Sequence, residues 1–209
     1  MRWVIGGWQA VIHRLEHRAR ELGVRIELGS RVTELPSHPT IVATELASAR
    51  MLLGDESLRW ESGHCVMLDL PVVDGRADFF ITWDLDSGGF HESSSVQDHA
   101  VAPAGESLFQ IDLPVRSGES VASAPLAVGT VPGWRDRVTW QRSGTAKGRT
   151  GALDLPGSSW QDRTAIERGG DVFLAGDMVA APGMRGEISI NSAIRAAQGA
   201  IVAATAVPR

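Results

Sequence analysis

The sequence predicts a mixed α/β protein with helices and buried strands at both ends of the chain and a strand-rich middle. Residues 8–22 repeat apolar side chains at three- and four-residue steps, as an amphipathic helix does. Residues 187–205 form a second helical run, rich in small residues, after the segment 171–175, in which the last four residues are apolar. From about residue 55 to 142, short apolar segments alternate with Gly, Ser, Asp and Pro, which predicts a largely antiparallel sheet.

The N-terminal part is expected to run from helix to strands and back to a helix. Gly23 is suited to a left-handed cap at the end of the first helix. Residues 24–28 and 31–35 alternate apolar and polar side chains around a Gly-Ser turn, which predicts a hairpin. Residues 40–44 predict a buried strand, and residues 45–53 predict a short helix that ends at Gly54.

In the middle of the chain, four short apolar segments predict strands, at residues 65–70, 79–83, 108–113 and 138–140. Residues 116–123 predict a loop, and residues 124–133 a short helix. The glycine cluster at 144–151 lacks the spacing of a phosphate-binding loop and predicts a flexible loop. His91 and Glu92 stand in a Ser-rich segment, where a solvent-facing loop is the simplest expectation.

Composition narrows the classes of function. The chain has 209 residues, 43% of them hydrophobic, and a formal net charge of −5. A mildly acidic chain without a Lys/Arg cluster argues against nucleic acid as the main partner. The sequence has no apolar run of about 20 residues, so we expect at most peripheral membrane contact. The single cysteine, Cys65, suits a reducing compartment, and we expect a cytoplasmic protein.

Two common kinds of catalytic site have no support in the sequence. Neither His-Glu-x-x-His nor Cys-x-x-Cys occurs, and the six histidines are scattered, so we expect no metal centre. Nor does a Gly-x-Ser-x-Gly motif occur to place a nucleophilic serine.

The C-terminal segment carries the strongest functional signal. Asp171-Val-Phe-Leu-Ala-Gly-Asp177 predicts a strand that ends in an acidic turn and leads through a Gly/Pro loop into a helix. Gly176 lets the backbone come close to a ligand, and Asp177 can accept a hydrogen bond from a ribityl or ribose hydroxyl. The same pattern also occurs in plain strand-to-helix turns, so both interpretations stay open at this point.

Both ends of the chain together resemble the flavin-dependent amine oxidase and phytoene desaturase superfamily, and the desaturase-like branch more closely. The resemblance rests on Ile5-Gly-Gly-Trp-Gln-Ala10, on Gly23 to Leu35, and on the segment from Val172 to Ala197. It implies a partial FAD-binding, Rossmann-like domain made of residues 1–54 and 143–209. A mostly antiparallel, β-rich substrate domain, residues 55–142, would be inserted into it.

The resemblance also implies positions for FAD. Val32 would meet the adenine, and Gly176 and Asp177 would hold the ribityl-phosphate part. The loop that enters the last helix would face the flavin ring, with the residues Gly183, Met184, Arg185, Gly186 and Glu187. Arg185 could neutralise a phosphate or the reduced flavin, although a solvent-exposed arginine is the favoured interpretation.

The implied reaction is hydride removal from a C–H bond of an apolar or isoprenoid-like small molecule. Amine oxidases of this superfamily often flank the flavin with tyrosine, and this chain has no tyrosine and seven tryptophans. An apolar, non-amine substrate is therefore favoured. Trp160, Trp83 and Trp140 are candidates to line the substrate cavity, with core packing as the alternative.

One departure from the family is important. The sequence contains no Gly-x-Gly-x-x-Gly opening a βαβ unit, which is the element that holds the dinucleotide pyrophosphate. We therefore expect the chain to be the C-terminal part of such an enzyme, encoded by a truncated or split gene. The alternative is a non-catalytic remnant or interaction subunit that needs a separate N-terminal half. In either case the apolar faces of the first and last helices would seek a complementary subunit or a second copy in a homodimer.

Overall fold

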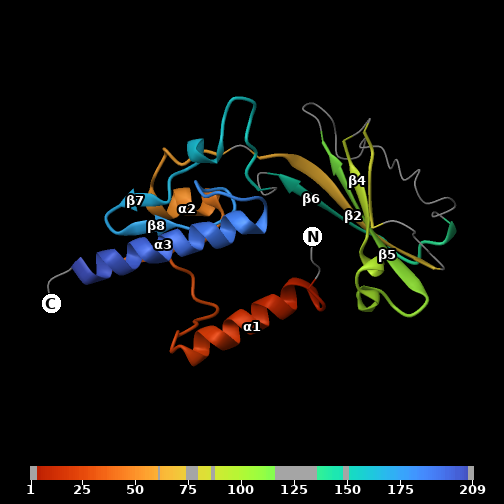
Figure 1. The fold of residues 1–209 in the computed structure, drawn as a ribbon, viewed down its shortest axis with the longest axis horizontal. Helices are drawn as coiled ribbons and strands as arrows, with labels where there is room; N and C mark the ends of the chain where they lie inside the picture. Colours follow the sequence, from red (N-terminus) through yellow and green to blue (C-terminus); the bar gives the residue numbers. More distant parts are fainter. Residues whose placement is uncertain are drawn as a thin grey trace. The chain divides into compact units, whose positions relative to one another are not determined.

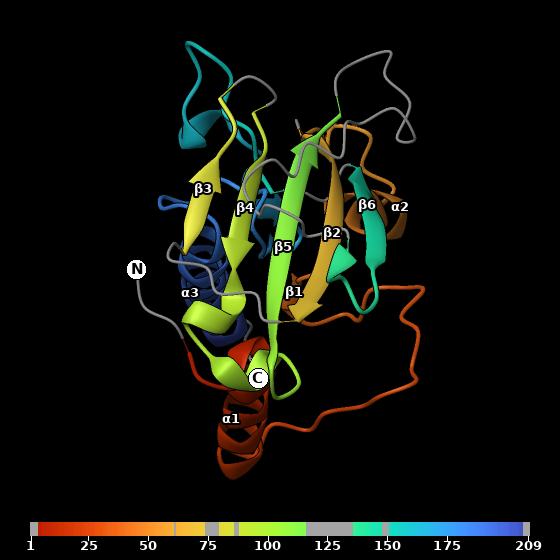
Figure 2. The same ribbon diagram turned by 90° about the vertical axis from the view of Figure 1, so that its right-hand side faces the viewer.

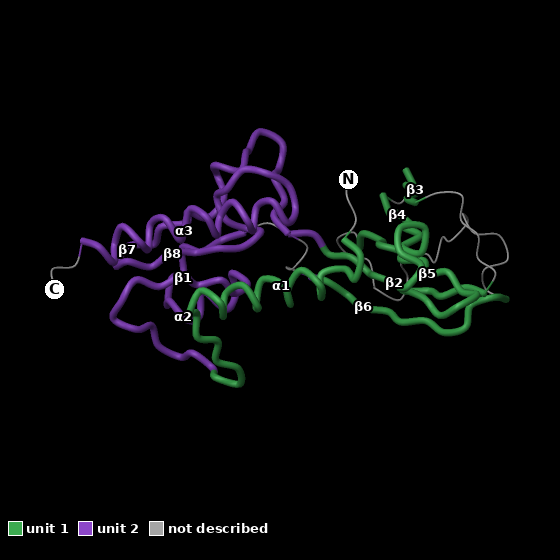
Figure 3. Tube along the Cα trace, turned by 60° about the horizontal axis from the view of Figure 1, so that its bottom comes forward, with its two compact units in different colours: residues 1–30, 64–146 green, residues 31–63, 147–209 purple. Residues whose placement is uncertain are grey.

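The computed structural model describes residues 4–60, 62–73, 80–85, 88–115, 136–147 and 151–206 (Figure 1). The chain divides into two compact units, unit 1 with residues 1–30 and 64–146 and unit 2 with residues 31–63 and 147–209 (Figure 3). The described residues form three α-helices and two sheets, which confirms the mixed α/β class. The structure groups residues 1–30 with the β-rich middle of the chain, whereas the sequence analysis places them with the C-terminal part.

Unit 1 contains a five-stranded sheet. Its strands follow the order β3 (Ile81–Trp83), β4 (Phe90–Ser93), β5 (Glu106–Pro114), β2 (His64–Val73) and β6 (Arg142–Lys147), as Figure 2 shows. The pairs β3–β4, β4–β5 and β2–β5 are antiparallel, which confirms the expected pairing type. Two short 3-10 turns, η1 (Ser94–Val96) and η2 (His99–Val101), connect β4 to β5.

The two long strands β2 and β5 place their main apolar cluster on one face of the sheet. Leu70 lies opposite Phe109 and Leu68 opposite Ile111, and these side chains are buried. They belong to a core cluster with Val66, Val72 and Leu113. On the alternate positions Asp69 lies opposite Gln110 and Met67 opposite Asp112, so that face of the sheet mixes polar and apolar side chains. Period-two alternation thus builds the core of unit 1.

Three expectations for the middle of the chain are wrong. Residues 138–140 form no strand, and only Val138 makes a single bridge, to Val72. The strand β6 occupies 142–147 and overlaps the loop expected at 144–151, because its polar and small side chains give no hydrophobic signal at this sheet edge. His91 and Glu92 lie in β4 rather than in a solvent-facing loop. The segments 116–123 and 124–133 lie outside the described residues.

The predicted N-terminal helix is confirmed as α1 (Gly7–Glu21). It starts at a Gly-Gly turn, where Gly6 and Gly7 both have positive φ, and the Gly6 N–H donates to Asp98 Oδ2 at 3.3 Å. No residue of α1 is buried. Its apolar side chains are exposed, including Trp8, Ile12, Leu15 and, just beyond its end, Leu22.

The hairpin predicted for residues 24–35 does not form. None of these residues belongs to a strand, and Val24, Leu28 and Val32 are all more than half exposed. A two-stranded hairpin is only marginally stable unless a third strand or a helix covers one face. Alternation alone therefore does not produce strands here.

Unit 2 contains a three-stranded sheet with helices packed against it. The strand β8 (Val172–Leu174) lies between β1 (Thr40–Val42), to which it is parallel, and β7 (Glu167–Gly169), to which it is antiparallel. The helices α2 (Leu46–Leu53) and α3 (Gly186–Ala206) supply Leu46, Ala49, Ile188 and Ala196 to the core around this sheet. The expected strands at 40–44 and 171–175 and both expected helices are confirmed, and α2 ends at Gly54 with left-handed backbone.

The packing of α3 on β8 depends on a glycine. A Cβ atom at Gly199 would lie only 2.3 Å from Cε1 of Phe173, so the aromatic ring occupies the space where a side chain would be. The ring therefore rests directly on the helix backbone, which fixes the position of α3 along the strand.

A partly exposed ion pair between Asp55 and Arg168 ties the end of α2 to β7 and predicts a pH dependence. Hydrogen bonds from Ser57 and from Arg168 lower the pKa of Asp55 to about 2. A carboxyl whose pKa is lowered by folding stabilises the folded state above its unfolded value of about 4 and loses this effect as the pH falls towards 2. We expect urea unfolding to show Asp55→Asn less stable than wild type at pH 6, with the difference shrinking between pH 4 and 2. A difference that is constant with pH would contradict this account.

Candidate functional site

A small cavity lies where the two parallel strands of unit 2 end. Because β1 and β8 are parallel, the residues that follow them, Thr44 and Glu45 after β1 and Gly176 and Asp177 after β8, meet at one edge of the sheet. These four residues, with Leu46, Ala175, Met178 and Val179, line a cavity of about 130 Å³. Ligands of α/β proteins bind outside the carboxyl ends of parallel strands. We name this cavity the carboxyl-edge pocket.

The turn at Gly176 is held by α3. The Gly176 N–H donates to Ser192 Oγ at 3.0 Å, and Ser192 Oγ lies 3.0 Å from the Gly176 carbonyl oxygen. Ser192 is fully buried in the first half of α3. Gly176 has φ 155° and open space where a Cβ would stand, so a side chain would meet backbone strain rather than a clash. The helix therefore positions this turn rigidly.

Asp177 is the acceptor of the carboxyl-edge pocket. Its side chain is exposed, and within the described residues no hydrogen bond or ion pair engages its carboxylate. Gly151 lies beside it, since a Cβ there would stand 3.6 Å from Asp177 Oδ2. An ionised carboxylate in this position can accept hydrogen bonds from the hydroxyl groups of a ligand.

The N-terminus of α2 adds hydrogen-bond donors to the same pocket. Leu46, the first residue of α2, lines the cavity, and the preceding Glu45 makes no side-chain cap hydrogen bond to the helix. Uncapped first-turn N–H groups carry partial positive charge. Thr44 and Glu45 are not among the site residues predicted from the sequence. The sequence does contain a signal for both residues, because they directly follow an apolar run. That run forms a strand parallel to the strand that ends in Gly-Asp.

The loop before α3 closes on itself instead of lining this pocket. The Met184 N–H donates to Glu187 Oε2 at 3.1 Å, so the Glu187 carboxylate satisfies the start of α3. Asn191 Nδ2 donates to the Pro182 carbonyl at 2.9 Å, and Arg185 is exposed with φ 54°. Gly183, Met184 and Gly186 belong to the same loop and, like Arg185 and Glu187, are absent from the lining of the carboxyl-edge pocket. Gly176 and Asp177 thus line the carboxyl-edge pocket, whereas residues 183–187 do not.

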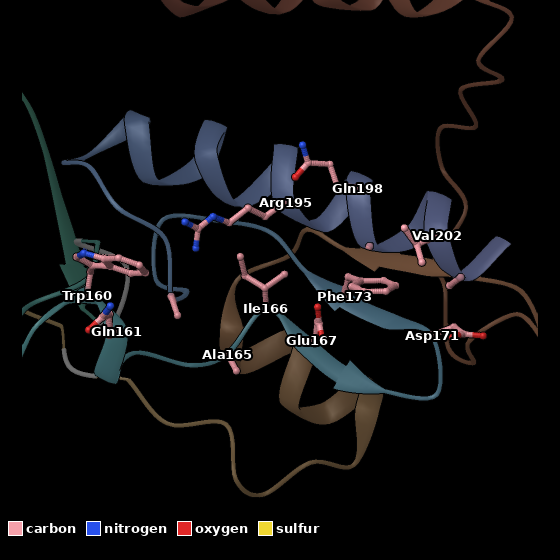
Figure 4. Close-up of a pocket in the computed structure, with 13 residues that line it drawn as sticks. Trp160, Gln161, Ala165, Ile166, Glu167, Asp171, Phe173, Arg195, Gln198 and Val202 are labelled. Carbon is pink, nitrogen blue, oxygen red and sulfur yellow. The ribbon is translucent and has the colours of Figure 1, made fainter. Parts of the chain in front are cut away.

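The remaining residues named from the sequence lie elsewhere. Val32 is 60% exposed in an extended segment without strand partners. Trp160 lines a separate groove of unit 2, shown in Figure 4. Trp83 and Trp140 belong to unit 1 and are about half exposed, and the Trp83 ring centre lies 5.1 Å from that of Phe90.

Unit 1 holds two buried titratable groups, His91 and Cys65. His91 is only 2% exposed, and burial lowers its pKa while Asp84 acts in the opposite direction. Burial also raises the pKa of the Cys65 thiol to about 11, and the neighbouring Asp112 adds to that rise. Burial also raises the pKa of the Asp112 carboxyl. The lowered pKa of His91 and the raised pKa values of Cys65 and Asp112 all favour the neutral form of these side chains.

Cys65 should therefore react slowly with thiol reagents in the folded protein. With a pKa of about 11, only about one thiol in a thousand is ionised at pH 8, against about a quarter for an ordinary cysteine. We expect labelling by a disulfide reagent at pH 8 to be slower by more than a hundredfold than in urea. Equal rates in buffer and in urea would show that the thiol is not protected by the fold.

Two comparisons with known proteins assign no family to the chain. A scan against protein-family models gives no match, and neither does a search of curated proteins. In the described part of the chain, no three or more His, Cys, Asp or Glu side chains gather as a metal would need. Of the helices in that part, none combines the length and the apolar character required to cross a membrane.

Proposed function

We propose that unit 2 binds the flavin of FAD at the carboxyl-edge pocket and that the chain serves an FAD-dependent oxidoreductase of the phytoene desaturase type. The observation that carries the proposal is the convergence of Gly176, Asp177 and the start of α2 at the ends of two parallel strands. This arrangement supplies a close backbone approach, a free carboxylate acceptor and helix-end donors.

The residues fit one part of FAD and not the whole molecule. A cavity of about 130 Å³ accommodates a ribityl or ribose segment, whereas ligand sites for whole cofactors and drug-sized molecules span about 300 to 1,000 Å³. The sequence also lacks the glycine-rich phosphate cradle. If three charge-assisted hydrogen bonds of roughly 2 kcal/mol each are missing, affinity falls by about four orders of magnitude.

In this proposal the chain positions the cofactor and does not perform acid or base chemistry. FAD, when bound, supplies the redox chemistry by accepting a hydride from the C–H bond of an apolar substrate. Asp177 would fix the polyol through its hydroxyl groups, and the Gly176 backbone, pinned by Ser192, would hold the turn against the ligand. The rigid α3–β8 packing keeps these groups in place during binding.

Fluorescence titration of the whole chain with FAD tests the proposal. We expect saturable quenching of flavin fluorescence, with riboflavin competing because it carries the same ribityl chain. ADP-ribose, which shares only the other end of FAD, should compete weakly. Absence of saturation up to about 1 mM FAD, which corresponds to about 4 kcal/mol of binding free energy, would contradict the proposal.

A second candidate function is that of a subunit whose site is completed by a separate polypeptide. Exposed apolar surface favours this function. The face of α1 with Trp8, Ile12 and Leu15 is exposed, as are Ile190 and Ile201 of α3. The parallel pair of unit 2 ends at β1, an edge strand, although parallel strands are usually flanked and covered on both faces. Such surface favours association with another chain.

We therefore expect light scattering after size-exclusion chromatography to show a species larger than 22.4 kDa. Replacing Ile12 and Leu15 by Glu should shift the chain towards the monomer, because charges on this face oppose burial. The matched control replaces Arg14 and His17, polar residues of the same helix, by Glu. A wild-type chain that elutes as a stable monomer would count against this second candidate.

A further inference from the structure

A larger groove in unit 2 has the dimensions of a complete ligand site. It has a volume of about 930 Å³ and lies between α3 on one side and η5 (Trp160–Asp162) with the β7–β8 hairpin on the other (Figure 4). Ligand sites usually occupy about 300 to 1,000 Å³. The groove shares no lining residue with the carboxyl-edge pocket, so it is a separate feature of the molecule.

One end of this groove carries a cation that is available to a ligand. The Arg195 guanidinium lies 5.3 Å from the centre of the Trp160 ring, a cation–π distance. Within the described residues Arg195 has no acidic partner in an ion pair. A guanidinium stacked on an aromatic ring keeps its N–H edge free, and this edge matches the two oxygens of a carboxylate or phosphate.

The body of the groove is mostly apolar, with the Glu167 carboxylate at its side, and its other end carries Asp171. Ile166 and Phe173 line it, with the Phe173 ring resting on the bare backbone at Gly199. Figure 4 shows Trp160 and Arg195 towards one end and Asp171 with Val202 towards the other. The Asp171 carboxylate would repel an anion at that end, so charge favours a single orientation of an amphipathic ligand.

We propose that this groove binds an amphipathic small molecule whose apolar body lies along Phe173 and Val202 and whose anionic head meets Arg195. The head is a carboxylate or a phosphate, because both present paired oxygens to a guanidinium. The site is independent of the proposed flavin site.

Isothermal titration of the whole chain with four ten-carbon probes, each below its micelle concentration, tests the proposal. Decanoate and decyl phosphate should bind with one site per chain, and the tighter of the two identifies the head group. Decanol and decylamine share the body without the anion and should bind at least tenfold more weakly. Equal affinity for all four probes, or no binding of either anion, would overturn the proposal.

Variants locate the site. Arg195→Gln should weaken binding of the preferred anion about tenfold or more, in line with the loss of a charge-assisted contact, and Arg195→Lys should weaken it less. Arg50→Gln removes the same charge from α2 of the same unit, outside the groove, and should have no effect. Asp177→Asn should leave the binding of the probes unchanged, which separates this site from the flavin site. An Arg195→Gln chain that keeps its circular dichroism and binds the anion as wild type would overturn the assignment.

Discussion

Leu174→Ala is expected to destabilise unit 2 by about 2 to 5 kcal/mol. Leu174 is 1% exposed, ends the central strand of the sheet and belongs to the core cluster with Val42, Leu46 and Ala196. The substitution removes buried methyl groups and leaves a cavity that helices on a three-stranded sheet can fill only in part. Because Leu174 stands two residues before Gly176, the turn of the carboxyl-edge pocket should loosen as well.

Urea unfolding followed by circular dichroism measures this loss. The control is Leu174→Met, which keeps the apolar volume and should cost less than about 1.5 kcal/mol. If the alanine and methionine variants unfold at the same urea concentration as wild type, Leu174 does not hold the core in the way that the packing indicates.

Asp177→Asn is expected to weaken FAD binding roughly tenfold without affecting stability. The asparagine keeps one acceptor oxygen and loses the charge, so a hydrogen bond worth about 1.5 to 3 kcal/mol becomes a neutral one worth about 1 kcal/mol. A difference of 1.4 kcal/mol corresponds to a factor of ten in affinity. The side chain is exposed and makes no hydrogen bond within the described part of the chain, so folding should not depend on it.

Asp171→Asn is the matched control for this experiment. Asp171 precedes the same strand at its opposite end, and asparagine tolerates its positive φ of 61°. Fluorescence titration of both variants should show reduced affinity for the Asp177 variant alone. Equal losses in both variants would indicate a general charge effect and not a contact at the turn.

The sequence predicts most of unit 2 because its elements carry strong local signals. Apolar runs that end in Gly-Asp or lead into helical periodicity predict β1, β8, α2 and α3. The prediction fails for residues 24–35, where the alternation of apolar and polar side chains suggests a hairpin but no element covers those side chains. Propensity and pattern are weak guides where tertiary packing decides the outcome.

Site residues that directly follow one recognisable strand can be predicted from the sequence. Site residues that reach the cavity only through the pairing of two distant segments cannot. Gly176 and Asp177 stand on a recognisable strand, and the structure places both at a cavity. Thr44 and Glu45 reach that cavity only because β1 pairs in parallel with a strand about 130 residues later, as the pairing of Thr40 with Val172 shows. The role of Glu187 depends on a local hydrogen bond to Met184 that no residue pattern specifies uniquely. The FAD role of residues 183–187 and of Val32 stays a prediction.

The most direct test of flavin binding at the carboxyl-edge pocket is a chemical-shift titration of the ¹⁵N-labelled chain with FAD. We predict that the largest saturable shifts fall on the backbone amides of Gly176, Asp177 and the residues from Thr44 to Leu46. Arg195 and Trp160, which line the separate groove, should move little. Shifts confined to that groove, or no saturable shift at any amide, would contradict the account.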